Sequence, residues 1–393
     1  MTIRLYYTDP LLRSFDAIVQ SCDASGDRFS IVLDRTAFYP TSGGQPFDTG
    51  QLGTATVLDV DDDDSGIVRH IVDVPLSAGA PVHGEIDWPR RFDHMQQHTG
   101  QHVLSAAFDR LFDVRTVSFH LGAETSTIDL AREVSASEIA RAETLANEVV
   151  WEDRPVTVRF VDDDEAAALP LRKEPKRTGR LRLVDVAEFD LSACGGTHVP
   201  NTGRIGVIAV SGSERFKGGS RIGFVCGGRA LKSHGRLRDV VAQATRLLSV
   251  GAAELPATIE RLQEEQKAQA RTLRRLQEEM AVSRAEQLRA EAQDIGGVRY
   301  VLSAQSGWDG GALKTLAAAI VSGPGAVTVL VGDGQPAPVV VARSADISID
   351  AGAWMKRATT ELGGRGGGRP DLAQGGIAAT AAEILSYAKR TLI

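Results

Sequence analysis

Two short segments of this chain carry side chains that bind metal ions. The first is His98-Thr-Gly-Gln-His102, and the second, farther along the chain, is Cys194-Gly-Gly-Thr-His198. Residues four apart share one face of a helix, so His98 and His102 can present both imidazoles to one point. The two glycines allow a tight loop that turns Cys194 and His198 inward. Three imidazoles and a thiolate are a ligand set that tetrahedral zinc prefers, so the two segments predict a zinc site.

The first segment differs from the helix motif of zinc metalloproteases. Those enzymes carry glutamate beside the first ligand in HExxH, where it acts as the general base. In this chain Thr99 follows His98 and Gln101 precedes His102. The segment therefore lacks a protease-type base, and proton transfer must come from elsewhere, for example from the substrate itself.

Two further segments flank this pair, and together the four carry a resemblance to a known family. They are FYPTSGGQPFDTG, RFDHMQQHTGQHVLS, RLVDVAEFDLSACGGTHV and GGRGGGRPDLAQGG, in that order. The chain resembles the alanyl-tRNA editing proteins of the AlaX type, in their long form. It is also similar to the editing and C-terminal portions of alanyl-tRNA synthetase. One departure is Gly100, where the family usually has alanine; one small residue replaces another there.

The composition indicates a globular protein of two or three domains. The chain has 393 residues, 42% hydrophobic and 24% charged, which is ordinary for a soluble protein. It has no apolar stretch long enough to span a membrane and no signal-like N-terminus, so neither export nor membrane insertion is expected. Three cysteines fit a reducing cytoplasm better than a disulfide framework. We therefore expect a cytoplasmic protein.

The charge distribution combines an acidic whole with one basic tract. The net charge of −7 argues against a broadly basic surface. The tract from Leu171 to Arg182 nevertheless carries six positive charges and one negative charge, and it leads toward the Cys194 loop. A solvated basic turn is the alternative, but the position favours contacts with phosphates of RNA. The residues predicted to bind tRNA here are Arg172, Lys173, Lys176, Arg177 and Arg180.

The first two predicted domains make an α+β arrangement. Residues 1–88 alternate short β-rich runs with turns, which indicates a small antiparallel barrel or sandwich, and Asp61–Asp64 reads as a solvated hairpin loop. Residues 89–250 form the expected zinc-binding editing domain. Its patterns predict helices over 91–112 and 137–151 and strands at 156–161, 181–186, 205–210 and 221–225.

The last two predicted domains are a helical connector and an α/β domain. Residues 251–295 have apolar positions at alternating spacings of four and three, which favours a long amphipathic helix and is a weak coiled-coil signal. Residues 296–393 alternate strands with alanine-rich helices and close on a helix over 377–393. The segment Gly363–Gly376 is too glycine-rich for us to expect a helix or strand interior there.

This last domain resembles the C-terminal module shared by alanyl-tRNA synthetases and DHH-type phosphoesterases. No DHH motif occurs, because Asp93-His94 is followed by Met95, so phosphoesterase chemistry is not transferred. Glycines let backbone N–H groups approach phosphates, and Arg365 and Arg369 add charge. We expect tRNA binding by this DHH-associated domain, with homodimer formation through it as a second role.

The resemblance implies a free-standing editor of mischarged tRNA, because no ATP-binding aminoacylation domain precedes residue 90. A pocket built for alanine cannot strongly reject glycine or serine, so a second site must hydrolyse the wrong ester. The implied substrate is chiefly seryl-tRNA(Ala), with glycyl-tRNA(Ala) open. Two other classes remain open: a zinc hydrolase of another ester or amide, and a non-catalytic zinc-containing RNA-binding protein.

The resemblance also implies roles for three residues outside the zinc ligands. Thr36 matches a threonine that recognises the serine hydroxyl, with a locally satisfied strand threonine as the alternative. Gln45 could contact the aminoacyl group or cap the glycine turn. Arg221 could contact phosphate or the ester carbonyl, or form a surface salt bridge. Whether four ligands close the zinc site or one position opens to water or substrate is not decided by the sequence.

Overall fold

The structure is a computed structural model that describes residues 1–63, 66–172 and 179–393. Lys173, Lys176, Arg177 and Asp64, which the sequence interpretation singled out, lie outside the described residues. The chain divides into two compact units, Met1–Gln243 and Ala244–Ile393, each with its own hydrophobic core. No helix among the described residues is both long enough and apolar enough to cross a membrane. The finer division into four domains stays a prediction.

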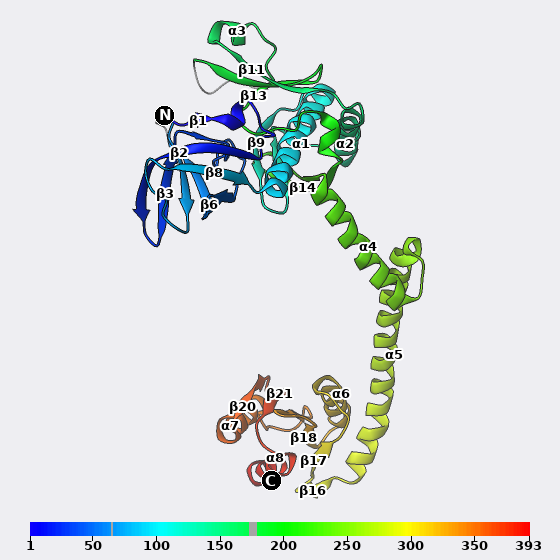
Figure 1. Ribbon diagram of the computed structural model, residues 1–393. Helices are drawn as coiled ribbons and strands as arrows, with labels where there is room; N and C mark the ends of the chain where they lie inside the picture. The colour runs from blue at the N-terminus through cyan, green and yellow to red at the C-terminus, as the bar shows by residue number, and fades with distance from the viewer. Residues whose placement is uncertain (64–65, 173–178) are drawn as a thin grey trace. The chain divides into compact units, whose positions relative to one another are not determined.

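The N-terminal part of the first unit is a closed six-stranded barrel, blue in Figure 1. Along its strands buried and exposed residues alternate, and Phe15, Ala17 and Val19 point inward from the first of them. A short parallel pair, β1 (Ile3–Arg4) with β4 (Arg35–Thr36), lies outside the barrel order. The barrel strands, in spatial order, are β2 (Ser14–Ser25), β3 (Arg28–Leu33), β7 (Val68–Val72), β6 (Ala55–Asp62), β5 (Gly50–Leu52) and β8 (Pro81–Ile86).

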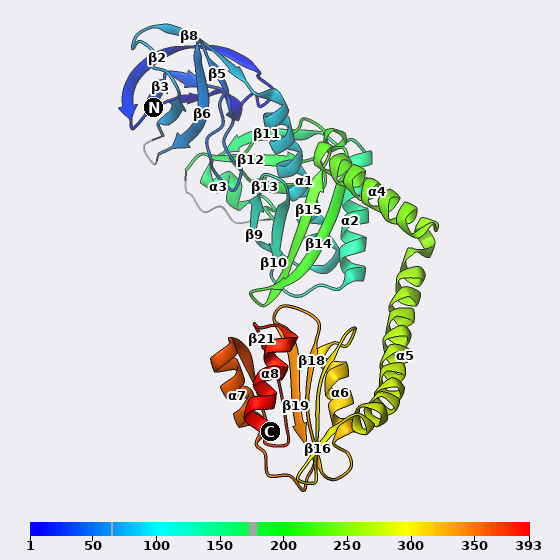
Figure 2. The same ribbon diagram turned by 90° about the horizontal axis from the view of Figure 1, so that it is seen from below.

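Two helices and a four-stranded sheet follow the barrel. Helix α1 (Trp88–Phe112) begins at Asp87, whose carboxylate accepts a hydrogen bond from the backbone N–H of Arg90. Helix α2 (Ala136–Trp151) begins with a capping box between Ser135 and Glu138. Both helices lie on one face of the sheet (Figure 2). Its strands are β14 (Ile208–Phe216), β15 (Gly219–Cys226), β10 (Ser126–Leu130) and β9 (Thr116–Leu121).

The strand predicted at 205–210 begins later than expected. Residues Thr202–Ile205 form a 3-10 turn, and Gly206 has a φ of 86°, a conformation that suits glycine and interrupts a strand. A second, three-stranded sheet contains β11 (Val156–Val161), β12 (Leu181–Val186) and β13 (Asp190–Ala193). The short helix α3 (Asp163–Ala167) lies in the connection between β11 and β12. The β12–β13 hairpin leads directly into the Cys194 loop. Helix α4 (Gly228–Leu248) follows β15.

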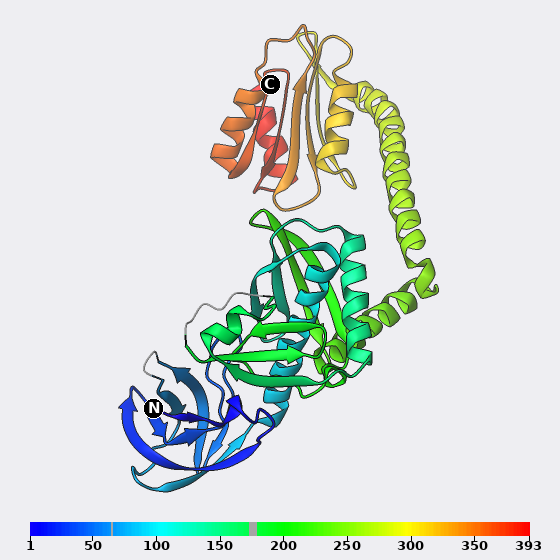
Figure 3. The ribbon, with the colours of Figure 1, turned by 90° about the horizontal axis from the view of Figure 1, so that it is seen from above.

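The second unit is a six-stranded mixed sheet between two helical layers. Helices α7 and α8 cover one face of the sheet and α6 covers the other (Figure 3). Val339 and Val341 of β19 pack with α7 and α8, while Val340 and Ala342 pack with α5 and α6. The helices are α5 (Leu255–Ala290), α6 (Gly310–Ile320), α7 (Ala351–Leu362) and α8 (Ala381–Leu392). The strands, in spatial order, are β16 (Gln293–Ile295), β17 (Val298–Gln305), β18 (Ala326–Gly332), β19 (Ala337–Arg343), β21 (Leu372–Ile377) and β20 (Gly364–Gly368). The predicted α+β class is thus confirmed for the chain.

The expectation that the glycine-rich segment forms no strand is wrong. Strands β20 and β21 lie in that segment and pair antiparallel at the edge of the sheet. A Cβ at Gly366 or Gly375 would lie 2.9 Å from the side chain of Met355 on α7, so glycine lets this edge pack closely on the helix. Because β21 extends to Ile377, the closing helix starts at Ala381 and not at residue 377.

Candidate metal centre

The four predicted metal ligands come together in the first unit. Helix α1 carries His98 and His102 and contacts β13, after which the loop with Cys194 and His198 begins (Figure 1). Their ligand atoms all lie within 4.8 Å of one another. The Cys194 Sγ is 3.3 Å from His98 Nε2 and 3.4 Å from His198 Nε2. The three histidines are buried, and only Cys194 is partly exposed.

Each of the three imidazoles has an oxygen partner on its Nδ1 atom. The pairs are His98 with Gln45 Oε1 at 2.8 Å, His102 with Asp190 Oδ2 at 2.8 Å, and His198 with Thr99 Oγ1 at 3.2 Å. The amide and carboxylate oxygens can only accept a hydrogen bond. Thr99 donates its own hydroxyl hydrogen to the Met95 carbonyl at 2.8 Å, so it too accepts from the histidine.

This pattern places the proton of each neutral imidazole on Nδ1 and leaves every Nε2 lone pair for the centre. Metal-bound histidines in proteins are oriented by such outer hydrogen bonds. Gln45 therefore helps to orient His98. Its amide nitrogen also donates a hydrogen bond to Thr197 Oγ1 at 2.8 Å. The structure gives Gln45 a partner that the sequence interpretation did not foresee, and its contact with an aminoacyl group stays a prediction.

The electrostatics of the cluster favour the metal-binding forms of Cys194 and His198 but not that of His102. Burial opposes ionisation of Cys194, but His98 and His198 hold the pKa of its thiol well below the usual value. Burial lowers the pKa of His198 to about 3, so this imidazole is neutral. Burial also opposes a charge on His102, yet hydrogen bonds to Asp190 and Cys194 raise its pKa to about 9. A metal ion that binds must therefore displace a proton held by His102. The donor set fits zinc.

Asp190 is the most strongly held outer partner of the site. Its carboxylate is buried and accepts hydrogen bonds from His102, from Ser192 and from the Arg172 guanidinium. Arg172, predicted to contact tRNA, thus forms an ion pair behind a metal ligand, and its role in RNA binding stays a prediction. The sequence interpretation missed Asp190 and Thr99. The available signal was their position inside the two motifs, four residues before Cys194 and next to His98.

The other predicted site residues have well-defined partners away from the cluster. Thr36 is fully buried and its Oγ1 is 2.8 Å from His70 Nε2. The other nitrogen of His70 is 3.1 Å from the Ile31 carbonyl, which can only accept, so the Thr36 hydroxyl donates to His70. The Thr36 oxygen also accepts a hydrogen bond from the backbone N–H of Phe38. One lone pair on that oxygen is then left to accept a further hydrogen bond.

Arg221 lies on the sheet face opposite the one that packs on α1. Its guanidinium forms an ion pair with Asp129 at 2.7 Å and stacks 3.6 Å from the Phe216 ring centroid. The next residue, Ile222, is buried in the core on the α1 side, and neighbours along a strand point to opposite faces. Arg180 is exposed and lies 4.9 Å from the Phe160 ring centroid. The structure brings neither arginine into the four-ligand cluster.

Comparisons with known proteins show the family of this chain. Residues 12–90 match the class II (A) tRNA synthetase family, residues 181–223 match the threonyl and alanyl tRNA synthetase second additional domain, and residues 297–392 match the DHHA1 domain. The alanyl-tRNA editing protein AlaX-L of Pyrococcus horikoshii is 31% identical over 406 residues, which cover 100% of this chain and 98% of that protein. The chain belongs to the AlaX-L family of alanyl-tRNA editing proteins.

The same chain is similar to part of a larger group of proteins. Alanine–tRNA ligase of Pyrococcus abyssi is 34% identical over 392 residues, and that of Natronomonas pharaonis is 36% identical over 399 residues. The matched segments cover 96% and 95% of this chain but only 42% of each ligase. The C-Ala domain of Aquifex aeolicus alanyl-tRNA synthetase matches 25% of this chain at 24% identity and a TM-score of 0.24. The present chain thus spans less than half the length of these ligases.

Proposed function

We propose that this chain is a trans-acting editing hydrolase that deacylates tRNA(Ala) charged with the wrong amino acid. The chief substrate in this proposal is seryl-tRNA(Ala), and glycyl-tRNA(Ala) is the second. The supporting observation is the cluster of His98, His102, Cys194 and His198 with every imidazole oriented by an outer partner. Membership of the AlaX-L family supports the substrate class. Hydrolysis of an ester needs no ATP, and the reaction would protect translation fidelity in the cytoplasm.

We propose zinc as the metal that these four side chains hold. When bound, zinc supplies a positive charge that polarises an ester carbonyl or a water molecule. The chain's own residues orient the ligands: Gln45, Thr99 and Asp190 fix the three imidazoles, and the Cys194 thiol is poised to be a thiolate. The partly exposed side of the cluster is that of Cys194, so substrate is expected to approach there.

One experiment tests both proposals and the two rival functions. Purified protein is incubated with seryl-, glycyl- and alanyl-tRNA(Ala), with and without a chelator, and then with zinc added back. We expect hydrolysis of the seryl ester, little hydrolysis of the alanyl ester, and loss and recovery of activity with the metal. Turnover of other esters but not of charged tRNA would favour a different zinc hydrolase. Binding of tRNA without turnover would favour a non-catalytic RNA-binding protein.

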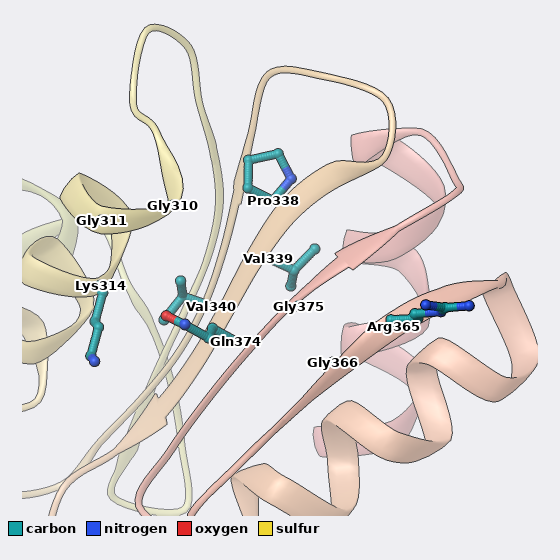
Figure 4. Close-up of a pocket in the computed structure, with 10 residues that line it drawn as sticks. All are labelled: Gly310, Gly311, Lys314, Pro338, Val339, Val340, Arg365, Gly366, Gln374 and Gly375. Atoms are coloured by element: carbon teal, nitrogen blue, oxygen red, sulfur yellow. The ribbon is translucent and has the colours of Figure 1, made fainter. Parts of the chain in front are cut away.

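For the second unit we propose tRNA binding at a groove beside the glycine-rich strands. This cavity of about 680 Å³ lies between α6 and the sheet edge. Figure 4 shows Lys314 on one side, Arg365 on the other, and Val340 and Gln374 between them. Among the described residues neither Lys314 nor Arg365 has an ion-pair partner, so both charges are free to meet phosphates. Arg369 instead pairs with Asp371 at 2.9 Å.

The test compares charge removal at these positions. Arg365→Gln with Lys314→Gln should weaken tRNA binding and reduce its dependence on salt, because each phosphate contact contributes to that dependence. Arg369→Gln, whose charge is already paired, should have a smaller effect and serves as the control. Equal effects of all three substitutions would contradict the groove as the binding surface.

A homodimer formed through the C-terminal part stays a proposal. Helix α5, in the predicted connector before that domain, could extend such a contact, because exposed apolar side chains lie on it in two groups with spacings of three and four. They are Ile259, Leu262, Leu273, Leu276 and Met280. Sedimentation at several protein concentrations tests it, and a single species with the mass of one chain at all of them would remove it.

A further inference from the structure

The guanidinium of Arg182 lies beside the metal centre and has a hydrogen-bond donor to spare. Arg182 precedes Leu183 on β12 and is only 8% exposed. Its Nη1 donates to the carbonyl of Cys194 at 2.7 Å, and its Nε donates to the carbonyl of Tyr7 at 3.2 Å. Its Nη2 is fully buried and has no hydrogen-bond partner among the residues that the structure describes.

Arg182 also differs from the other buried arginines of this unit in having no carboxylate partner. The buried Arg91 pairs with Asp48 and the half-buried Arg172 pairs with Asp190, whereas no carboxylate of the described residues lies within ion-pair distance of Arg182. Burying a guanidinium without a carboxylate partner is unfavourable. The nearest favourable charge is the Cys194 thiolate, and the proposed metal would take up that charge. The cationic side chain at this position therefore points to an anionic ligand.

Arg182 lies next to the partly exposed ligand of the centre. Of the four ligands only Cys194 is partly exposed, and the backbone N–H of Cys194 donates to the carbonyl of Arg182 at 3.1 Å. The guanidinium carbon lies 5.4 Å from the centroid of the partly exposed Tyr7 ring. Tyr6, whose ring centroid is 5.0 Å from that of Tyr7, has a second buried hydroxyl without a partner. The unused donor of Arg182 thus belongs to the side chain that holds the main-chain carbonyl of the partly exposed ligand.

We propose that Arg182 binds a negatively charged oxygen at the acylated 3′ end of the RNA substrate, next to the metal centre. The proposal rests on the proposed editing function and names a substrate-contacting residue of that site. Two oxygens of the substrate have this chemistry. One belongs to the terminal phosphodiester, and the other is the ester carbonyl oxygen, which gains charge as water adds to the carbonyl carbon. The bond to the ribose oxygen then breaks, and that oxygen receives a proton originating from the water.

The test uses the full-length protein with Arg182→Gln and Arg182→Lys. The control is Arg110→Gln, since Arg110 also donates to two main-chain carbonyls, those of Phe189 and Glu188, each at 2.9 Å. Binding is measured by calorimetry with a non-hydrolysable seryl-amide analogue of adenosine, with and without a 5′-phosphate. Rates are measured on seryl-tRNA(Ala), and metal content is measured for every variant.

We expect Arg182→Gln to retain its metal and to lose about 10²- to 10³-fold in activity, the size reported for removal of one donor to a developing oxyanion. Arg182→Lys should recover part of the loss, and Arg110→Gln should stay close to wild type. If weaker binding requires the 5′-phosphate, the oxygen is that of the phosphodiester. If binding is unchanged and only the rate at saturation falls, the oxygen is the ester carbonyl.

Three results would overturn the proposal while leaving the editing function standing. They are unchanged binding and rate in Arg182→Gln, a loss that follows metal content and is repaired by added zinc, and an equal loss in Arg110→Gln. The two hypotheses fail differently. A wild-type protein that neither binds the analogue nor hydrolyses the seryl ester would instead remove the proposed function, and the Arg182 proposal with it.

Discussion

At the scale of single residues, the two adjacent glycines of the Cys194 loop are not equivalent. A Cβ added to Gly196 would lie 2.1 Å from Cε1 of His98, whereas the nearest atom to one on Gly195 is the Tyr7 hydroxyl at 3.7 Å. Gly196→Ala must therefore move His98 or the loop. We expect it to lower zinc content and seryl-tRNA hydrolysis strongly, while Gly195→Ala keeps both. Elemental analysis and a deacylation assay measure this, and equal behaviour of the two variants would refute it.

The packing around Gly100, the position where the chain departs from its family, explains why glycine stands there. A Cβ there would lie 2.3 Å from the sulfur of the buried Cys226. Gly100→Ala should lower the free energy of unfolding by about 1–3 kcal/mol through overpacking. Cys226→Ala removes the obstructing sulfur, so the double variant should recover most of that loss. Urea unfolding of the two single variants and the double variant measures the coupling. Strictly additive effects would contradict this account.

The cluster of four candidate ligands was predictable from sequence, whereas most of its supporting residues were not. His98 and His102 share a helix face, and Cys194 and His198 flank a glycine pair, so local spacing alone pairs each half. Which oxygen meets each Nδ1 depends on residues distant in sequence, such as Gln45 opposite His98. The Nη2 of Arg182, which has no partner within the described parts of the chain, is likewise visible only once β12 and β13 are paired.

At the scale of elements, strand β13 connects the metal site to its outer support. Asp190 and Ser192 are buried on one face of the strand, and Cys194 follows directly after its end. Side chains two residues apart along a strand point to the same face. The same stretch of backbone thus directs the Asp190 carboxylate to His102 and the Cys194 sulfur to the centre.

The Asp190 carboxylate is expected to strengthen metal binding through His102. Asp190→Asn keeps a hydrogen-bond acceptor of the same shape but removes the charge, and it leaves Arg172 unpaired. We expect zinc affinity to fall by about 10- to 100-fold, as is typical for outer partners of metal ligands. Asp129→Asn, which breaks the ion pair with Arg221 on the opposite sheet face, is the matched control. Competition with a chromophoric chelator measures the affinities. If Asp129→Asn weakens zinc binding equally, general destabilisation explains the result.

The glycine-rich edge shows a limit of pattern reading at this scale. Propensity argues against strands with four glycines in five residues, yet β20 has them. The deciding term is tertiary, since Gly366 and Gly375 permit close packing against Met355. The sequence periodicity of the strands carries no information about their packing on α7, which carries Met355. The strand pair was therefore not predicted, whereas α1, α2 and α5 were.

At the scale of the whole molecule, the two units carry separate parts of the proposed function. All four metal ligands, Gln45, Asp190 and Arg182 lie in the unit Met1–Gln243, and the groove with Lys314 and Arg365 lies in the unit Ala244–Ile393. Each unit has a hydrophobic core of its own residues. Chemistry and part of the RNA binding should therefore be separable by truncation.

A protein that ends at Val250 keeps the whole first unit and the described part of the basic tract. We expect it to hydrolyse seryl-tRNA with a raised KM and a shallower dependence of KM on salt, because phosphate contacts of the second unit are removed. The rate at saturating tRNA should fall much less, since no residue of the metal site is lost. Rates at saturating and subsaturating tRNA at two salt concentrations measure both effects. A folded, zinc-loaded truncation whose saturated rate collapses would show that the second unit helps to form the active site.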